Sequence, residues 1–164
     1  DILEASLSRF NIGRSYGSIY TGQSPLDSSK GIQVASIIAD KDFIKTMEIP
    51  IVSGAGFATH LFQQESTSTG DSLLKRNRSR PTYISRALLK EYGIKGSPLG
   101  QEVKGLGAYI VGEIGDFKGL SLRTENPYLD IVISNQPLRF GYLYLKISGS
   151  NTQATLNFIE RKWT

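Results

Sequence analysis

The chain has 164 residues, of which 39% are hydrophobic and 21% are charged. This length suits one domain with a buried core, and this balance of residues excludes an intrinsically disordered chain. No apolar run reaches the length of about 18 residues that a membrane-spanning helix needs. Cysteine is absent and His60 is the single histidine, which excludes disulfide bonds, thiolate catalysis and a metal site built from several histidines.

The first half of the sequence predicts two strands with a short helix between them. Residues 32–38 (IQVASII) have the apolar pattern of a strand. Residues 40–49 predict a short helix, with Asp40 or Asp42 available as its N-cap. Residues 49–56 predict a second strand, in which a proline is tolerated only at an early or edge position. The chain begins without a methionine, and we expect it to be a piece of a longer protein.

A polar and aperiodic stretch follows at residues 58–80, and we expect a mobile insertion there. A basic run inside it carries a charge of +4, which equals the net charge of the whole chain. No aromatic residue lies between Phe62 and Tyr83, which is unlike a nucleic-acid-binding surface, so no nucleic acid is expected as a partner. The run is either a solvated loop or a surface for anionic lipid headgroups. This candidate interaction patch consists of Lys75, Arg76, Arg78 and Arg80.

The second half of the sequence mixes strands and helices, with several strands in succession. This order favours an α+β fold in which a few helices pack on a mixed β-sheet. The apolar patterns predict strands at 81–85, 101–105, 109–114, 129–134 and 142–148, and helices at 86–93 and 151–164.

Two carboxylates at the end of one predicted strand raise the question of acid–base catalysis. Glu113 and Asp116 are three residues apart, so in a regular strand their side chains diverge. A pair that acts on one bond needs its carboxyl groups about 5–10 Å apart and convergent. The sequence also lacks a phosphate-binding glycine loop, a nucleophile elbow and a metal-ligand cluster. We therefore predict no catalytic, cofactor-binding or metal-binding residues.

The closing helix is predicted to have an apolar stripe made of Leu156, Ile159 and Trp163, which Phe158 widens. We expect this stripe to pack against a sheet face, because an exposed stripe is a liability in a soluble fragment. The strand at 142–148 offers either Tyr142, Tyr144 and Lys146 or Leu143, Leu145 and Ile147, and we favour the second, aliphatic set.

Four blocks of sequence resemble the MacB-like periplasmic core domain of FtsX-type ABC transporter permeases, most closely its Bacteroidetes-type versions. The segment ADKDFIKTMEIPIVSGAGF resembles an acidic-aromatic helix, a turn and a strand of that family, with Ala55 where the family has arginine. The segment PTYISRALLKEYGIKGSPLGQEV resembles the family's next strand and helix. YIVGEIGDFKGLSLR is similar to the pattern I-V-G-V-V-x-D-F-x-x-x-S-L, and YLYLKISGSNTQATLNFIERKW resembles the closing strand and helix.

The resemblance implies the fold, place and role of the chain. We expect residues 1–164 to form a single periplasmic domain, with a truncated membrane-proximal lobe as an open alternative. The role it implies is non-catalytic: coupling the motion driven by a cytoplasmic ATPase to export or to envelope partners. It also implies that Asp116 and Phe117 form a structural turn, in which the carboxylate caps the turn and the ring packs into the core.

The implied location is the cell inner membrane, with the domain facing the periplasm. The implied partners are the membrane spans of the full-length permease, a cytoplasmic ABC ATPase, a second permease in a dimer, and a periplasmic adaptor or envelope protein. A different class of function also remains open. In that alternative, the chain is an extracytoplasmic binding module for a peptide, a lipid headgroup or a partner protein.

Overall fold

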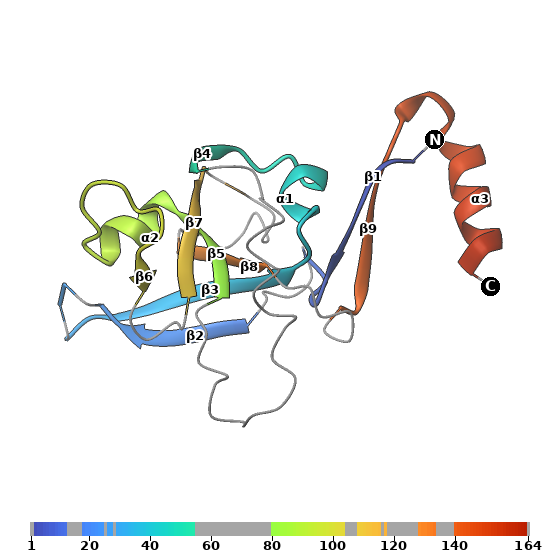
Figure 1. Ribbon diagram of the computed structural model, residues 1–164. Helices are drawn as coiled ribbons and strands as arrows, with labels where there is room; N and C mark the ends of the chain where they lie inside the picture. Colours follow the sequence, from blue (N-terminus) through green and yellow to red (C-terminus); the bar gives the residue numbers. More distant parts are fainter. Residues whose placement is uncertain are drawn as a thin grey trace, which may run out of the picture.

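Figure 1 shows a computed structural model of the chain. The structure describes residues 2–12, 18–24, 26–27, 29–54, 80–103, 108–115, 117, 128–133 and 140–163. The predicted insertion at 58–80 lies outside the described residues apart from Arg80, so its mobility stays a prediction.

The described strands form one nine-stranded mixed sheet, which confirms the predicted α+β fold. Its main path runs β4-β7-β5-β8-β3-β1-β9, while β2 pairs with β3 and β6 pairs with β7. The β3–β8 and β5–β7 pairs are parallel, and the other pairs are antiparallel. The strands are β1 (Ile2–Ser8), β2 (Ser18–Gln23), β3 (Gly31–Ala39), β4 (Ile51–Gly54), β5 (Arg80–Ser85), β6 (Glu102–Val103), β7 (Ala108–Ile114), β8 (Leu129–Ile133) and β9 (Tyr142–Ile147).

Three α-helices accompany the sheet in the described part of the chain, and all three fall where the sequence predicts helices. They are α1 (Phe43–Thr46), α2 (Arg86–Glu91) and α3 (Thr152–Trp163), the last preceded by a 3-10 turn, η4 (Gly149–Asn151). The Ser85 hydroxyl caps α2 by accepting a hydrogen bond from the Leu88 N–H, 3.4 Å away. After α2 the chain reverses at Gly93, whose φ of 65° lies in the left-handed region that glycine adopts without steric cost. No described helix is long and apolar enough to cross a membrane.

The core lies on both faces of the sheet, because β3 and β8 are central strands. Helix α1 covers one face, where its Phe43 and Ile44 join Ala35, Ile37, Ala39, Ile49, Tyr83, Ile114, Leu129, Ile131 and Ile133 in one buried cluster. Helix α2 covers the other face, where Leu88 and Leu89 join Ile32, Val34, Ile84 and Ile110 in a second cluster. The two helices are therefore anchored by opposite side-chain rows of the same strands.

Strand β7 is not a regular strand, although the sequence pattern suggests one. Thr82 pairs with Ile110 but the next residue, Tyr83, pairs with Gly112, so Val111 forms a bulge. The bulge moves Ile110 into the α2-side cluster and Ile114 into the α1-side cluster. In a regular strand Ile110, Gly112 and Ile114 would share one face, and the bulge instead separates Ile110 from Ile114.

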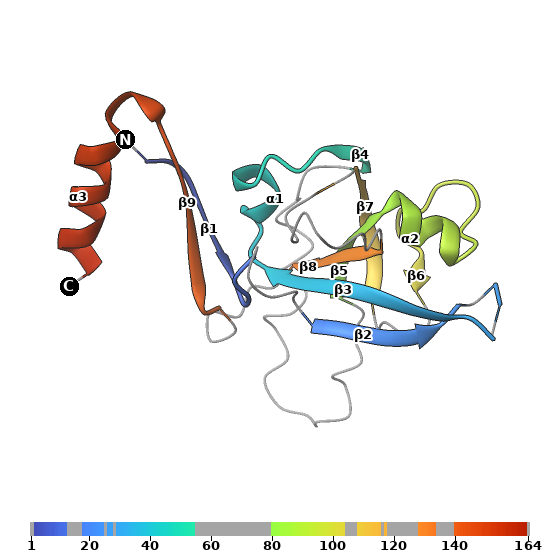
Figure 2. The ribbon, with the colours of Figure 1, turned by 180° about the vertical axis from the view of Figure 1, so that it is seen from behind.

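Strands β1 and β9 leave the rest of the sheet as a two-stranded antiparallel ribbon, which we call the ribbon (Figures 1 and 2). In both views the ribbon stands between α1 and α3. No strand is predicted before residue 32, yet β1 and β2 lie there. For β1 the signal in the sequence is the alternation of Glu4, Ser6 and Ser8 with Ala5 and Leu7, which has the period of a strand.

The prediction that the closing helix buries its apolar stripe is wrong. In α3 the exposed fractions are 48% for Leu156, 46% for Phe158 and 73% for Trp163. The physical reason is that α3 stands beside a ribbon of only two strands, which is too narrow to cover a full helix face (Figures 1 and 2). That α3 packs on the aliphatic row of β9 stays a prediction. Tyr144 and Lys146 point to α1 and the turn after it.

Candidate functional site: the joint between the core and the ribbon

The ribbon joins the core sheet at one narrow place, which we call the joint. Within the described residues, Ser8 and Ala39 are the only register partners between β1 and β3. Two backbone hydrogen bonds flank this pair: Arg9 N–H donates to the Ile38 carbonyl and Asp40 N–H donates to the Leu7 carbonyl, each at 2.9 Å. A connection this short constrains the position of the ribbon but gives it little resistance to rotation by itself.

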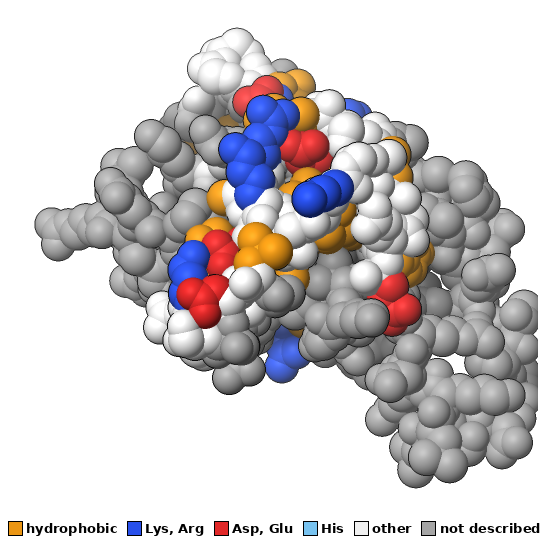
Figure 3. Space-filling view, turned by 90° about the vertical axis from the view of Figure 1, so that its left-hand side faces the viewer, with side chains coloured by type: hydrophobic (Ala, Val, Ile, Leu, Met, Phe, Trp, Pro, Cys, Tyr) orange, Lys and Arg blue, Asp and Glu red, His pale blue; other side chains and the backbone are white. Residues whose placement is uncertain are grey.

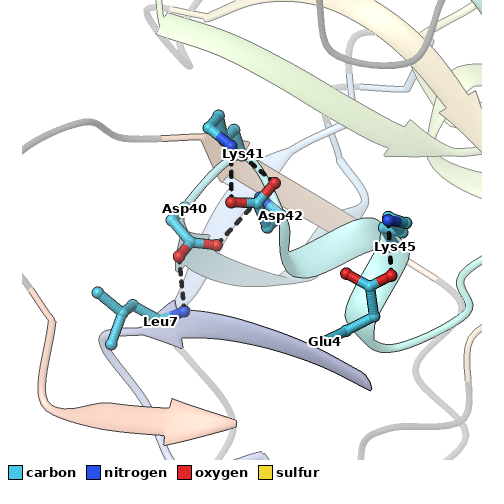
Figure 4. Close-up of polar contacts among 6 residues, drawn as sticks. All are labelled: Glu4, Leu7, Asp40, Lys41, Asp42 and Lys45. Atoms are coloured by element: carbon cyan, nitrogen blue, oxygen red, sulfur yellow. Dashed lines mark hydrogen bonds and ion pairs between the residues drawn. The ribbon is translucent and has the colours of Figure 1, made fainter. Parts of the chain in front are cut away.

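Asp40 strengthens the joint from the end of β3 (Figure 4). Its carboxylate accepts hydrogen bonds from the Leu7 N–H at 2.8 Å and from the Asp42 N–H at 3.1 Å. One side chain therefore holds both the ribbon and the turn that begins α1. Burial raises the pKa of the Asp40 carboxyl, and the two N–H donors act in the opposite direction.

Aromatic packing forms the interior of the joint. Phe43 of α1 is fully buried and meets the ring of Tyr144 of β9 edge to face, with 6.0 Å between the centroids and 84° between the planes. The Tyr144 hydroxyl accepts a hydrogen bond from the Ile12 N–H at 2.6 Å and donates one to the Phe10 carbonyl at 2.9 Å. Burial raises the pKa of Tyr144. Tyr144 thus connects β9, helix α1 and the chain that follows β1.

Two ion pairs form the outer side of the joint. The Lys45 ammonium lies 2.6 Å from the Glu4 carboxylate, and the Lys146 ammonium lies 2.5 Å from the Glu48 carboxylate. In both pairs one partner belongs to the ribbon and the other to α1 or the turn after it. The hydrogen bond to Glu4 raises the pKa of Lys45.

Of the predicted turn and patch residues, the structure describes only Phe117 and the backbone of Arg80. Phe117 is half-buried and packs against the α1-side core cluster, as expected of its ring. Asp116 lies outside the described residues, so the structural turn stays a prediction. In the candidate interaction patch, Lys75, Arg76 and Arg78 also lie outside the described residues, and the structure describes only the backbone of Arg80, at the start of β5.

Glu113, the other carboxylate considered for acid–base catalysis, makes contacts within the domain. Its carboxylate accepts a hydrogen bond from the Arg86 Nε at 2.6 Å, and the Ser53 hydroxyl lies 3.4 Å from its other oxygen. The Glu113 side chain is 14% exposed. It therefore ties β7 to the start of α2 and to β4. Among the described residues, no group of three or more histidine, aspartate or glutamate side chains could hold a metal ion.

A second polar cluster lies at the end of α2, around Glu91. Its carboxylate accepts hydrogen bonds from the Lys30 ammonium at 2.8 Å and from the Tyr128 hydroxyl at 2.9 Å. The hydrogen bond from Lys30 is the largest of the effects that lower the pKa of Glu91 to about 2. Figure 3, which views the molecule from the left-hand side of Figure 1, shows basic side chains beside acidic ones on the described part of that face.

The Glu91 cluster predicts a step in stability at acid pH. Because the folded pKa of about 2 lies below the ordinary glutamate value of 4.5, the ionised carboxylate stabilises the fold fully above pH 4.5. This contribution is lost as pH falls from 4.5 toward 2. We expect Glu91→Gln to lower the melting temperature at pH 7 and to flatten its decline below pH 4.5. Melting curves of the wild type and the variant between pH 7 and pH 2 test this prediction. It would be contradicted if the melting temperature of the wild type fell with pH as little as that of the variant.

Sequence reasoning missed the joint, because its residues are far apart in the chain. The sequence pattern places Asp40 and Phe43 only in a short helix, and Tyr144 only in one row of a strand. The signal that could have located the joint is the alternation of side-chain types along β9. Its tyrosines and lysine alternate with aliphatic residues, which indicates a strand with different contacts on its two faces.

Comparison with known proteins places the fold among extracytoplasmic transporter domains. No family model matches the sequence, and no curated protein matches it either. The extracellular domain of YknZ, a noncanonic ABC-type transporter from Gram-positive bacteria, matches with a TM-score of 0.55 at 12% identity, covering 94% of this chain and 70% of that domain. The periplasmic region of MacB from Actinobacillus actinomycetemcomitans matches with a TM-score of 0.53 at 10% identity, covering 96% of this chain and 64% of that region.

These matches rest on shape and not on sequence. This chain spans 70% and 64% of the two solved domains, so each of them contains further structure. Both matches extend over nearly all of this chain. The chain therefore has the fold of the MacB-like periplasmic core domain.

Proposed function

We propose that this chain is the extracytoplasmic domain of an ABC transporter permease. In this proposal it belongs to a protein of the cell inner membrane, faces the periplasm, and carries no catalytic or cofactor site. The fold supports it, because both matched structures are domains of transporters that lie outside the cytoplasm. Residues 1–164 are then one domain, with the stretch at 58–80 as an insertion.

We further propose that the domain couples motion rather than performing chemistry. The observation that carries this proposal is the joint, where two packed units meet through one described register pair, Ser8 and Ala39. A unit held by a short connection and a few side chains changes orientation at a small energetic cost, whereas a continuous sheet resists bending. The driving partner in this proposal is a cytoplasmic ABC ATPase, acting through the membrane spans of a dimeric full-length permease on an adaptor or envelope protein.

A single engineered cysteine in the full-length permease tests both parts of the proposal. The chain has no cysteine, so Lys95→Cys, at an exposed position after α2, gives one label site in this domain. In cells whose outer membrane alone is permeable, we expect a membrane-impermeant maleimide to label it. Labelling only after rupture of the inner membrane would place the domain in the cytoplasm and contradict the proposal.

The same variant tests coupling and the dimer. With a spin label on the introduced thiol and the permease reconstituted with its ATPase in nanodiscs, we expect a distance between the two protomers. This distance should shift between the nucleotide-free state and the state trapped with ATP and vanadate. An ATPase variant that cannot hydrolyse ATP is the control and should give no trapped state. An unchanged distance while the ATPase turns over would contradict coupling, and the absence of any inter-protomer distance would contradict the dimer.

A further inference from the structure

Four charged side chains of the joint form an alternating set across the gap between α1 and the ribbon. On the ribbon, Glu4 and Lys146 are direct register partners, so their side chains leave the same face next to each other. Lys45 faces Glu4 and Glu48 faces Lys146, each at ion-pair distance. Each carboxylate therefore meets an ammonium group across the gap, and a shift of the ribbon by one register position would break both pairs.

The backbone conformation of Glu48 is strained, so a glutamate at this position lowers the stability of the turn. Helix α1 ends in a Schellman motif, in which the Glu48 N–H donates to the Lys45 carbonyl at 3.1 Å and the Ile49 N–H donates to the Ile44 carbonyl at 3.0 Å. The residue at this position takes a positive φ and is usually glycine. Glu48 has a φ of 52° and is the one described residue other than glycine with a positive φ. A glycine would fit this backbone without strain but would have no carboxylate to offer Lys146.

The ion pairs are also accessible to water and salt. On the core side the Lys45 and Glu48 side chains are 72% and 73% exposed, whereas Glu4 and Lys146 on the ribbon are 28% and 35% exposed. Exposed pairs of this kind are weak and are screened by dissolved ions. Salt and single charge substitutions therefore weaken these pairs, while the buried aromatic contact beside them keeps its packing.

We propose that Glu4, Lys45, Glu48 and Lys146 form an electrostatic latch that holds the ribbon against α1. When the latch opens, the ribbon turns about the Ser8–Ala39 pair within the range that the Phe43–Tyr144 contact allows. Helix α3 moves with it because only Ser148 and η4 separate α3 from β9. Asp40 keeps the pivot in place, since its carboxylate binds the ribbon at Leu7 next to that pair. The latch is a property of the fold and is independent of the proposed role in transport.

The test uses the chain itself, with one spin label on the core and one on α3. Lys95→Cys and Ala154→Cys place the labels at exposed positions outside the joint. At low ionic strength we expect a narrow distribution of distances between the labels. Raising the salt to about 1 M shortens the screening length to about 3 Å and should add a second, displaced population.

Charge variants then separate the latch from general screening. Lys45→Glu should raise the displaced population by up to about fivefold. Adding Glu4→Lys should reverse part of this rise, because the introduced lysine faces the introduced glutamate but lies beside Lys146. Lys41→Gln is the matched control. It removes an exposed lysine whose partner, Asp42, lies 2.7 Å away in the same turn and not on the ribbon. This control should leave the distribution unchanged.

Glu48→Gly distinguishes the latch from a purely structural role of this turn. If residue 48 serves only the backbone, glycine holds the ribbon at least as well as glutamate does. The latch predicts instead that Glu48→Gly broadens the distribution while the protein stays folded. Distributions that remain narrow in Glu48→Gly, in Lys45→Glu and at high salt would overturn the proposal.

Discussion

Replacing Phe43 with alanine should lower the free energy of unfolding by about 3–5 kcal/mol, the usual cost of removing a fully buried aromatic ring. The ring is 0% exposed and belongs to the α1-side core cluster. It is also the part of α1 that the Tyr144 ring packs against. The substitution therefore leaves a cavity at the place where the ribbon meets the core, and little else can move in to fill it. Chemical denaturation of the two proteins measures the difference.

Tyr144→Phe is the matched control for this prediction. It keeps the aromatic contact with Phe43 but removes the hydroxyl that binds the Ile12 N–H and the Phe10 carbonyl. We expect it to cost about 1–2 kcal/mol, the range for lost hydrogen bonds of this kind. If Phe43→Ala cost no more than Tyr144→Phe, the ring would not be a central part of the joint.

Replacing Gly54 with alanine should also destabilise the fold, by about 2–4 kcal/mol. Gly54 ends β4 with a φ of 101°, a conformation that a residue with a Cβ atom rarely adopts. A Cβ there would lie 2.5 Å from the Val111 carbonyl oxygen and 2.7 Å from the Gly112 Cα. Both are backbone atoms of β7, so relief of the clash requires β4 and β7 to separate. Chemical denaturation again gives the size of the effect.

Gly96→Ala separates the cost of the positive φ from the cost of the steric clash with β7. Gly96 has a φ of 76°, but a Cβ added there meets no atom within 4 Å. This variant therefore reports the cost of the backbone conformation alone, which we expect to be about 1–2 kcal/mol. Equal losses in the two variants would mean that β4 does not pack against β7 as closely as the structure places it.

Much of the central sheet follows from local patterns in the sequence. Strand β3, strand β5, helix α2 and strand β8 lie within one or two residues of their predicted ranges. Their signals are strong because apolar runs alternate with clear punctuation, such as the Ser85 cap and the Gly93 reversal. Such signals depend on neighbours in the chain, so they can be read without knowledge of the fold.

Other features depend on partners that are distant in the chain. The bulge at Val111 arises from pairing with β5, and no local pattern in β7 indicates it. The joint brings together residues as far apart as Phe10 and Tyr144, which are separated by 134 positions. The exposed stripe of α3 is a case where a correct local pattern led to a wrong expectation. The amphipathic helix is there, but the described sheet offers it only the two strands of the ribbon.

Helix α1 holds the ribbon to the core, and proton NMR of the isotope-labelled chain detects the contact between them. Phe43 and Tyr144 are 101 positions apart in sequence, so contact between them reports on the joint alone. Edge-to-face packing with the centroids 6.0 Å apart predicts nuclear Overhauser effects between the ring protons of the two residues. A spectrum in which Phe43 shows these effects to its core neighbours, but none to Tyr144, would contradict the account.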